Sequence, residues 1–347
     1  MKAPPKILFA LLDWGMGHAS RTAPLIEFAL NEKWEVHIAS KGTALAFLKS
    51  QFEGSGAYFH LKPGPEIAYA RRGNLFKIAL QIPGFLTSIG AEQQWTASLV
   101  AKLNITHIVS DNCYGVHHSS IPSVLISHQL QLPVPSLLSG LARHFVIRQA
   151  RRFQSIWVPD VDGFRFSGKL AAKNPLPHMQ AVGILSRLSN EVNAEKFDLV
   201  GMVSGPEPHR SLMENALMEW MQSQPKPALL IAGRPGDIKE EKGHVTIWPN
   251  PNATELAAAL KGAKIIVCRS GYSSLMDLVA LGKSAILVPT PGQPEQLYLA
   301  KHWKKTFGMA TCSQTDLEHR RIPEKTGSMD MYQPNIRACE LLRTWVQ

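Results

Sequence analysis

A histidine follows a tight glycine turn near the start of the chain, in DWGMGHASR at residues 13–21. Gly15 and Gly17 allow a sharp strand-to-helix turn and let a ligand phosphate approach the backbone closely. A helix that begins near His18 has a positive dipole end, which disfavours the imidazolium and keeps the ring able to accept a proton. His18 is therefore a candidate general base. The alternative is a histidine that only caps or packs at a helix start.

Polar residues also follow two of the apolar runs in this half of the chain. Asp111 ends the run in IVSDNCYG, and His128 and Gln129 follow SVLIS. The carboxyl ends of strands are where ligands gather in α/β sheets, so all three residues are expected at that edge. Asp111 is placed to hold the second ring nitrogen of His18 and to stabilise its charged form. The alternative is that Asp111 caps the next helix.

The second half of the chain has a loop and helix suited to phosphate at residues 203–220, VSGPEPHRSLMENALMEW. Pro208 suits a first helical position. Ser204 and Gly205 offer loop amides, and Arg210 lies in the first turn of the helix. Amides with one guanidinium make a clamp for a diphosphate. The alternative, a generic turn with a solvated arginine, gives no reason for a cation at a positive helix end.

A second phosphate-type turn occurs in CRSGYSSLMDLVALG at residues 268–282. We expect Gly271 to open the turn and Gly282 to close the helix. Asp277 has two interpretations: it forms a capping box with Ser274, or it accepts hydrogen bonds from a ribose diol. The candidates for phosphate contacts in this segment are Arg269, Ser270, Gly271 and Ser273.

A proline-rich loop, LVPTPGQPEQLYLA at residues 287–300, carries amide and carboxylate side chains. The prolines stiffen the loop, and Pro294 suits a helix start. Rigidly placed Gln293, Glu295 and Gln296 suit recognition of sugar hydroxyls. Glu295 also has a structural interpretation, as a complement to the helix dipole.

The elements that position these residues are short apolar strands alternating with longer helical patterns. Continuous runs rich in Ile, Val and Leu are typical of parallel strands covered by helices on both faces. The alternation predicts an α/β protein built from two doubly wound domains. The expected strands are KILFALL, WEVHIAS, AYFHL, ITHIVSD, SVLIS and SIWVP, then DLVGMVS, PALLIAG, HVTIWP, AKIIVC, SAILVP and GMATC.

The length of 347 residues also favours two domains. A proline-containing polar stretch near residues 170–190 predicts the linker. We therefore expect an N-terminal domain at 1–178, a C-terminal domain at 179–330, and a final helix at 331–347 that packs back on the first domain.

Composition limits the partners and the location. The net charge of +10 favours anionic partners such as nucleotide phosphates or an acidic membrane surface. The sequence has no basic helix face and no run of aromatic residues suited to base stacking, so a nucleic-acid partner is disfavoured. The four cysteines are far apart and form no CxxC pair, which predicts reduced thiols and a cytoplasmic protein. The first apolar run ends at Asp13 without a cleavage site, and no run is long enough to span a membrane.

Residues 70–90, ARRGNLFKIALQIPGFLTSIG, combine basic and large apolar side chains. This pattern suits a surface that contacts a membrane or a hydrophobic acceptor. It favours a peripheral protein at the inner face of the membrane. The alternative is a core-packing helix with a charged edge.

Taken together, GMGHASR, ISHQ, SGPEPHR and RSGYSSLMDLVALGKSAILVPTPGQPEQ resemble the family 28 glycosyltransferases, which include the peptidoglycan N-acetylglucosaminyltransferases. The resemblance covers residues 6 to about 305 and is most specific in residues 268–300. It implies the GT-B architecture, in which two Rossmann-like domains face each other across a cleft. It also implies a metal-free, inverting transfer from a nucleotide sugar, UDP-linked in this family, with no cofactor.

The resemblance assigns roles to matching positions. His18 corresponds to the candidate base, and Asp111 resembles the acid that supports the base in related transferases. Gly205 and Arg210 match the diphosphate loop, and Asp277 matches an acid that binds ribose. Residues 295–296 match the pair that contacts the donor sugar, although the family has two glutamines there and this chain has Glu295 and Gln296. The donor sugar and the acceptor, whether lipid-linked or glycan, stay open.

Two other functions are compatible with these motifs. A sugar-nucleotide 2-epimerase of GT-B architecture needs no acceptor, and a non-catalytic sugar-nucleotide binding protein needs no base. A nicotinamide dehydrogenase is disfavoured, because Ser20 stands at the third glycine of the dinucleotide fingerprint and Ser40-Lys41 replace the acid after the second strand.

Overall fold

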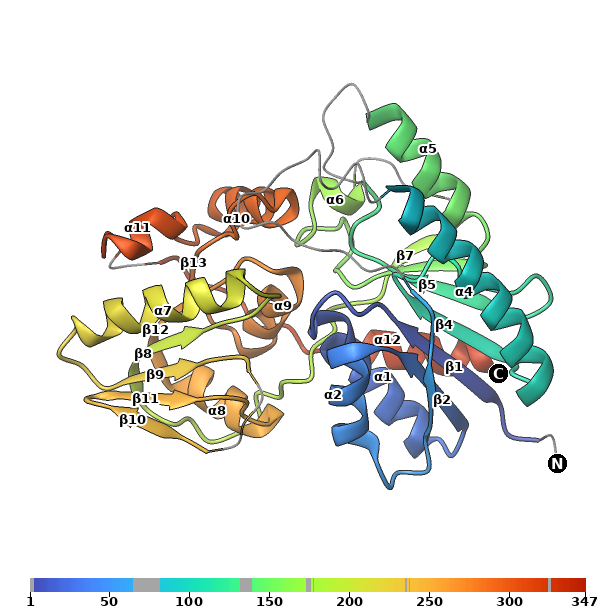
Figure 1. Ribbon diagram of the computed structural model, residues 1–347, viewed down its shortest axis with the longest axis horizontal. Coiled ribbons are helices and arrows are strands. Elements are labelled where there is room, and N and C mark those ends of the chain that lie inside the picture. The colour runs from blue at the N-terminus through green and yellow to red at the C-terminus, as the bar shows by residue number, and fades with distance from the viewer. Residues whose placement is uncertain are drawn as a thin grey trace. The chain divides into compact units, whose positions relative to one another are not determined.

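The computed structural model describes residues 3–64, 82–131, 139–172, 176, 178–234, 236, 238–323 and 326–347. Its contacts divide the chain into two compact units (Figure 1). The first unit consists of described residues up to Leu185 together with Asn335–Gln347, and the second contains Ser186–Pro334. The last helix is thus part of the first unit, although 149 residues of the second unit separate it from Leu185 in the sequence (334 − 185 = 149).

The first unit is built on a parallel sheet of seven strands in the order β3-β2-β1-β4-β5-β6-β7. The central strands are mostly apolar and are buried on both faces, which is typical of parallel sheets. The bounds are β1 Lys6–Leu11, β2 Glu35–Ser40, β3 Tyr58–Leu61, β4 His107–Asp111, β5 Ser123–Ile126, β6 Ser155–Val158 and β7 Met179–Ala181.

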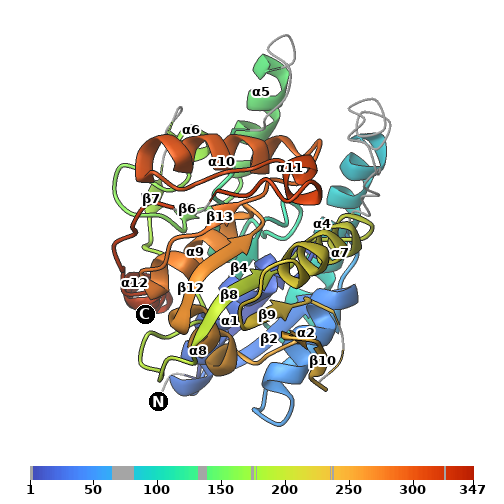
Figure 2. The same ribbon diagram turned by 90° about the vertical axis from the view of Figure 1, so that its left-hand side faces the viewer.

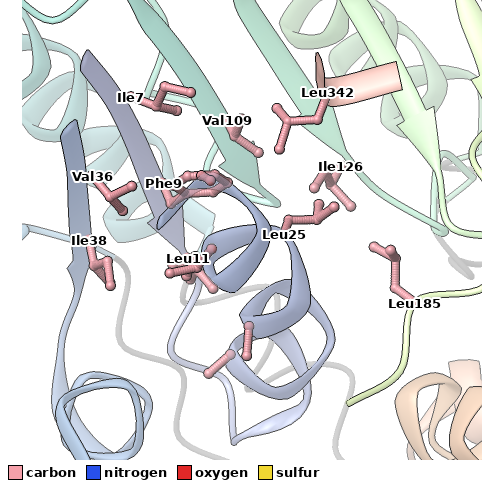
Figure 3. Close-up of a cluster of buried hydrophobic side chains, with 14 of the residues drawn as sticks. Ile7, Phe9, Leu11, Leu25, Val36, Ile38, Val109, Ile126, Leu185 and Leu342 are labelled. Atoms are coloured by element: carbon pink, nitrogen blue, oxygen red, sulfur yellow. The ribbon is translucent and has the colours of Figure 1, made fainter. Parts of the chain in front are cut away.

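Helices cover both faces of this sheet (Figure 1). One face carries α1 (Gly17–Asn31), α2 (Gly42–Phe52) and α12 (Ile336–Val346); the other carries α4 (Ile82–Leu103) and α5 (Ser139–Ala150), and the short α6 is Lys169–Ala172. Figure 3 shows Leu25 of α1 and Leu342 of α12 in the same cluster as Phe9 of β1. Burial of these apolar side chains explains why the C-terminal helix joins the first unit.

The second unit has a six-stranded sheet in the order β10-β11-β9-β8-β12-β13, parallel except for β10 (Figure 2). Helices α7 and α11 pack on one face, around Met213, Leu217 and Leu317. The strands are β8 Phe197–Met202, β9 Ala228–Ile231, β10 Glu240–Lys242, β11 Val245–Trp248, β12 Ala263–Cys268 and β13 Ile286–Leu287. The helices are α7 His209–Gln222, α8 Ala253–Gly262, α9 Tyr272–Leu281, α10 Pro294–Phe307 and α11 Gln314–Glu318.

The elements differ from the sequence predictions in a few places. The segment GMATC is not a strand; within it only Thr311 forms an isolated bridge, to Leu287. Residues 179–181 were expected to begin the second domain, but they pair with β6 and complete the first sheet, so the division falls after Leu185. Pro208 caps α7 rather than starting it.

Within the described residues, no helix is long and apolar enough to cross a membrane. Most of the basic and apolar segment at residues 70–90 lies outside the described residues. Its last part begins α4, where Phe85 packs against the cluster of Tyr114 and Val146.

Candidate functional site

The carboxyl edge of the first sheet brings the end of β1 level with the ends of two neighbouring strands. Leu11 lies beside Asp111, and Asp111 lies beside Ile126. Asp111 is therefore at the centre of this edge, and its side chain is completely buried. Buried carboxylates need several hydrogen-bond donors, and the donors come mainly from α1.

His18 reaches this carboxylate from the first turn of α1. Gly15 adopts a left-handed conformation with φ of 90°, which turns the chain from β1 into the helix. The His18 Nδ1 atom lies 2.8 Å from Oδ1 of Asp111. The ring keeps 13% of its side-chain surface exposed, and its Nε2 atom has no hydrogen-bond partner among the described residues. The structure thus brings the candidate base and its candidate support into direct contact.

Two residues that the sequence analysis did not single out complete this cluster. Arg21 donates from Nε to Oδ2 of Asp111 at 2.8 Å, and its Nη2 atom also contacts Oδ1. The Thr22 hydroxyl donates to Oδ2 at 2.6 Å. His18, Arg21 and Thr22 are three and four residues apart, a spacing that places them on one helix face. Their helical spacing from His18 is the sequence feature that could have predicted Arg21 and Thr22 as members of this site.

These contacts keep Asp111 ionised. Burial alone raises the pKa of this carboxyl, but the neighbouring Arg21 and His18 outweigh burial and hold the pKa well below its ordinary value. The four side-chain donors all come from α1, so Asp111 anchors α1 and does not act as a cap for a following helix.

The histidine that follows β5 joins the same cluster through Arg21. His128 is buried, and its Nδ1 atom lies 2.9 Å from Nη1 of Arg21. Gln129 is only half-buried, and its backbone N–H donates to the hydroxyl of Ser127. The structure therefore places His128, but not the Gln129 side chain, in contact with the cluster around Asp111.

The carboxyl edge of the second sheet also gathers three strand ends. Met202 lies beside Cys268, and Cys268 lies beside Leu287. The three loops that carry the donor-binding candidates begin just after these residues. Gly17 is the exception among those candidates, because it is the first residue of α1 in the first unit.

The first of these loops leads into α7. Gly205 has φ of 100°, a conformation that favours glycine, and Ser204 is half-buried. Arg210 donates to Glu207 at 2.6 Å, to the carbonyl of Ala232 at 3.1 Å and also to Glu214. Partial burial lowers the pKa of Arg210, but Glu214 and Glu207 more than compensate and raise it overall. Arg210 is thus held at the start of α7 by two carboxylates.

Arg269 has a different environment from the one expected for a phosphate ligand. It is 1% exposed, and its terminal nitrogens donate to the carbonyls of Val288 and His209 at 3.2 and 3.1 Å. Burial lowers its pKa to about 10. The guanidinium therefore connects the loop after β13 to the start of α7 through hydrogen bonds to their carbonyls. The prediction that Arg269 contacts the diphosphate directly is replaced by this supporting role, because its side chain is buried.

The neighbouring candidates begin α9. Gly271 is the N-cap of this helix, and Ser273 lies in its first turn. The Ser270 side chain is fully buried and donates to the carbonyl of Gln296 at 2.9 Å. Backbone amides of the first turn are the groups in this segment that suit an anion.

Asp277 does not form the capping box considered above. The helix starts at Tyr272, two residues before Ser274, so Asp277 lies in the middle of α9 and accepts a hydrogen bond from Ser186 at 2.5 Å. Burial raises its pKa to about 6, despite the opposing effects of Ser186 and Arg187. Gly282 closes the helix in the left-handed conformation, as predicted.

The proline-rich loop after β13 is anchored by one of its own candidates. Gln296 is buried, and its Oε1 atom accepts from the N–H of Thr290 at 2.9 Å. Gln293 is the N-cap of α10, and Glu295 lies in its first turn. Gln296 therefore stabilises the loop that presents the other two side chains. Within the described residues, no group of three or more metal-type ligands is placed to hold an ion.

The comparisons with known proteins agree with this architecture. Residues 233–337 match the glycosyltransferase family 28 C-terminal domain. Two relatives are the UDP-N-acetylglucosamine–N-acetylmuramyl-(pentapeptide) pyrophosphoryl-undecaprenol N-acetylglucosamine transferases of Syntrophus aciditrophicus and Streptococcus pyogenes. The chain is 26% identical to the former over 50% of each protein. It is 20% identical to the latter over 99% of this chain and 94% of that protein.

Another relative with the same name, from Prosthecochloris aestuarii, is 32% identical over 23% of each protein. The chain thus aligns with half or less of the length of the relatives from Prosthecochloris aestuarii and Syntrophus aciditrophicus. Among solved structures, the glycotransferase of kitacinnamycin aligns with a TM-score of 0.67 and 12% identity, covering 99% of this chain and all of that one. The calicheamicin glycosyltransferase CalG4 aligns with a TM-score of 0.63 and 13% identity, covering 99% and 92%. The chain therefore has the GT-B fold.

Proposed function

We infer that the chain is a glycosyltransferase of the family 28 group, and we propose that it transfers a sugar from a nucleoside diphosphate to an acceptor hydroxyl. The family 28 match and the transferase relatives support the enzyme class. These relatives are named for a UDP-linked donor, so we propose a UDP-sugar here as well. The charge of +10 suits such an anionic substrate.

The observation that carries the proposal is the contact between His18 and Asp111. An ionised carboxylate accepts hydrogen bonds only, so it favours the proton on Nδ1 of His18 and leaves the lone pair on Nε2. The His18 side chain is partly exposed, and its Nε2 atom has no partner among the described residues. It is therefore suited to accept a proton from an acceptor hydroxyl.

The proposed reaction is a single displacement. Nε2 of His18 takes the hydroxyl proton while the acceptor oxygen forms a bond to the anomeric carbon. The bond from that carbon to the diphosphate breaks, and its electron pair leaves with the diphosphate. Attack from the opposite side inverts the anomeric centre, and the nearby Asp111 carboxylate stabilises the imidazolium that results.

The second unit supplies the groups for the donor in this proposal. Loop amides near Gly205 and Gly271, with Arg210, stabilise the negative charge that develops on the leaving diphosphate, so the mechanism requires no metal ion. Asp277 accepts hydrogen bonds from the ribose diol. Glu295 and Gln293 recognise the sugar hydroxyls, and Glu295 replaces a family glutamine, so the sugar itself is not assigned.

The acceptor is proposed from the relatives alone. Those relatives are named for an undecaprenol-linked acceptor, which motivates a lipid-linked acceptor and a peripheral position at the cytoplasmic face of the membrane. A soluble glycan hydroxyl satisfies the same chemistry at His18. An assay with both acceptor types distinguishes them.

The decisive experiment measures transfer from a panel of UDP-sugars to mixed lipid-linked and glycan acceptors. His18→Ala is expected to lower kcat by ~10²–10⁴-fold, because a general base is lost, while the affinity for UDP is unchanged. His319→Ala is the matched control, since His319 is exposed in the second unit and its Nδ1 atom lies 2.7 Å from the carbonyl oxygen of Thr315. The control is expected to retain wild-type kcat.

Three results would contradict the proposal. Full activity of the His18→Ala variant would remove His18 from the base role. Epimerised donor formed without any acceptor would show a 2-epimerase instead. Tight donor binding without turnover against every acceptor would indicate a binding protein.

A further inference from the structure

The guanidinium of Arg21 lies between three groups that belong to different parts of the first unit. It bonds both oxygens of Asp111 at the end of β4 and contacts Nδ1 of His128 after β5. Its Nη2 atom also lies 3.1 Å from Nδ1 of His18, one turn earlier on α1. Arg21 is 2% exposed, so these contacts are made without competition from bulk water.

We propose that Arg21 is a positioning residue that determines which ring nitrogen carries the proton in His18 and in His128. A guanidinium has five donors and no acceptor, in a rigid planar fork. It therefore constrains its partners in a way that a neutral side chain or a flexible ammonium does not. The inference builds on the proposed base role of His18 and adds a residue that acts through it.

The effect on His18 operates through Asp111. Two donors from one planar group prevent rotation of the carboxylate, and Thr22 holds the Oδ2 oxygen as well. Oδ1 is then fixed 2.8 Å from Nδ1 of His18. Because the carboxylate is ionised, this nitrogen carries the proton and Nε2 is the acceptor. The competing arrangement, in which Nδ1 accepts from Arg21, would direct the ring lone pair at the carboxylate as well.

The effect on His128 is direct and has the opposite outcome. Nη1 of Arg21 is a donor, so Nδ1 of His128 must accept. The neutral ring then carries its proton on Nε2. One arginine thus makes Nε2 a proton acceptor in one histidine and a proton-bearing nitrogen in the other.

An ordinary structural interpretation is that Arg21 and Asp111 form a buried ion pair whose function is to join α1 to the sheet. Such a pair would lower stability when broken but would not depend on ring tautomers. The two interpretations are therefore separated by a spectroscopic measurement on the imidazoles, supported by kinetics.

The experiment uses nitrogen-15 NMR of the full-length chain, with the rings assigned from His18→Gln and His128→Leu. At a pH where both rings are neutral, we expect the wild-type protein to show a protonated Nδ1 in His18 and a protonated Nε2 in His128. The opposite tautomer in either ring would overturn the proposal. This measurement needs neither donor nor acceptor, so its result is independent of whether the chain proves to be a transferase.

Arg21→Lys is the test variant, because it keeps the positive charge beside Asp111 but cannot span the carboxylate and His128 with a planar fork. We expect a mixed tautomer in His128 and a kcat about 10–100-fold lower, as for a misplaced reacting group, with the KM for the donor unchanged. The control Arg151→Lys, at an exposed position of the first unit, should leave both the His128 tautomer and kcat unchanged. Unchanged tautomers and kcat in Arg21→Lys would refute the proposal.

A second pair of variants decides the question if Arg21→Lys does not fold. His128→Asn retains an acceptor for Nη1 of Arg21, whereas His128→Leu does not. His128→Asn should therefore keep more of kcat, and more of the Nδ1-protonated tautomer of His18, than His128→Leu. Equal behaviour of the two variants would contradict the role of Arg21.

Discussion

Side chains from three elements of the first unit converge on Arg21 and the carboxylate of Asp111, whereas the second unit distributes its candidate ligands over three separate loops. Around Asp111, the donors come from the first two turns of α1, and no oxygen is left without a partner. In the second unit, buried side chains such as Arg269 and Gln296 stabilise the loops through hydrogen bonds to their backbone. Both candidate sites thus lie at the carboxyl edge of a largely parallel sheet, but the first is one hydrogen-bonded cluster and the second is divided among three loops.

The difference follows from what each half of the proposed reaction requires. Proton transfer depends on the orientation of a single lone pair, so one buried, fully bonded cluster is suited to it. Binding a diphosphate depends on several N–H groups pointing at one anion, and loops that begin helices provide them. Substitutions at the first edge should therefore affect turnover, and those at the second edge should separate loop stability from ligand affinity.

The largest effect is expected from Asp111→Asn. The amide removes the negative charge that pairs with the buried Arg21 guanidinium, which should lower the free energy of unfolding by about 3–5 kcal/mol. It also removes the support of His18, so kcat should fall by ~10²–10⁴-fold. Urea unfolding and turnover at saturating donor measure the two effects.

Asp162→Asn provides the comparison for that variant. Asp162 is 80% exposed and pairs with Arg337 on the surface of the same unit, so its loss should cost less than about 1 kcal/mol. Equal stability losses in the two variants would show that the cluster around Asp111 is no more tightly coupled than a surface ion pair.

The next effect distinguishes two arginines of the second edge. Arg269→Met should lower the free energy of unfolding by roughly 1–3 kcal/mol, because it removes the buried hydrogen bonds from the guanidinium to the carbonyls of Val288 and His209. Arg210→Gln should leave stability nearly unchanged, since its carboxylate partners reach solvent, but weaken UDP binding by about 10-fold or more. Urea unfolding and calorimetric titration with UDP test the pair.

The reverse pattern would change the assignment of these arginines. If Arg269→Met lost UDP affinity at unchanged stability, its guanidinium would have to leave the carbonyls of His209 and Val288 and meet the ligand directly. Arg210, already bonded to Glu207 and Glu214, would then be the structural residue of the two.

The smallest effect concerns the buried carboxyl of Asp277. Its pKa is raised to about 6, above the ordinary 3.8, so the folded chain holds this proton more tightly than the unfolded chain. The contribution of this carboxyl to the free energy of unfolding is therefore complete below pH 3.8 and is lost as the pH rises to about 6. Only the ionised form accepts two charge-assisted hydrogen bonds from a ribose diol, so UDP affinity should fall by about fivefold as pH drops below 6.

Calorimetric titrations at several pH values check this prediction. Asp277→Asn should remove the part of the pH dependence that belongs to the carboxyl, while protonation of UDP itself remains. With 2′-deoxy-UDP, the wild-type protein should show a smaller pH effect than with UDP. An identical pH dependence for both ligands would exclude Asp277 as the ribose contact.

Much of the architecture was predictable from the residues alone. Apolar runs such as that ending at Leu11 predict parallel strands, and polar residues directly after a run must lie at the carboxyl edge of the sheet. This is why His18, Asp111 and Gly271 were predicted at strand ends. The short strands β7 and β10 were missed, because three residues are too few to form a recognisable pattern and those of β10 are all charged and exposed.

The sequence by itself determined which residues occur at each edge, because strand and helix periodicity depend on neighbours along the chain. The sequence predicted the contact of Asp111 with His18, but only the tertiary structure showed that Arg21 and Thr22 also bind this carboxylate. Arg21 is 90 residues away, and its contact depends on the order β1-β4-β5 and on the register of those strands. The same holds for Arg269, whose burial is determined by loops 60 residues earlier and 19 residues later. Contacts between distant segments depend on how sheets and helices pack, and local patterns do not contain that information.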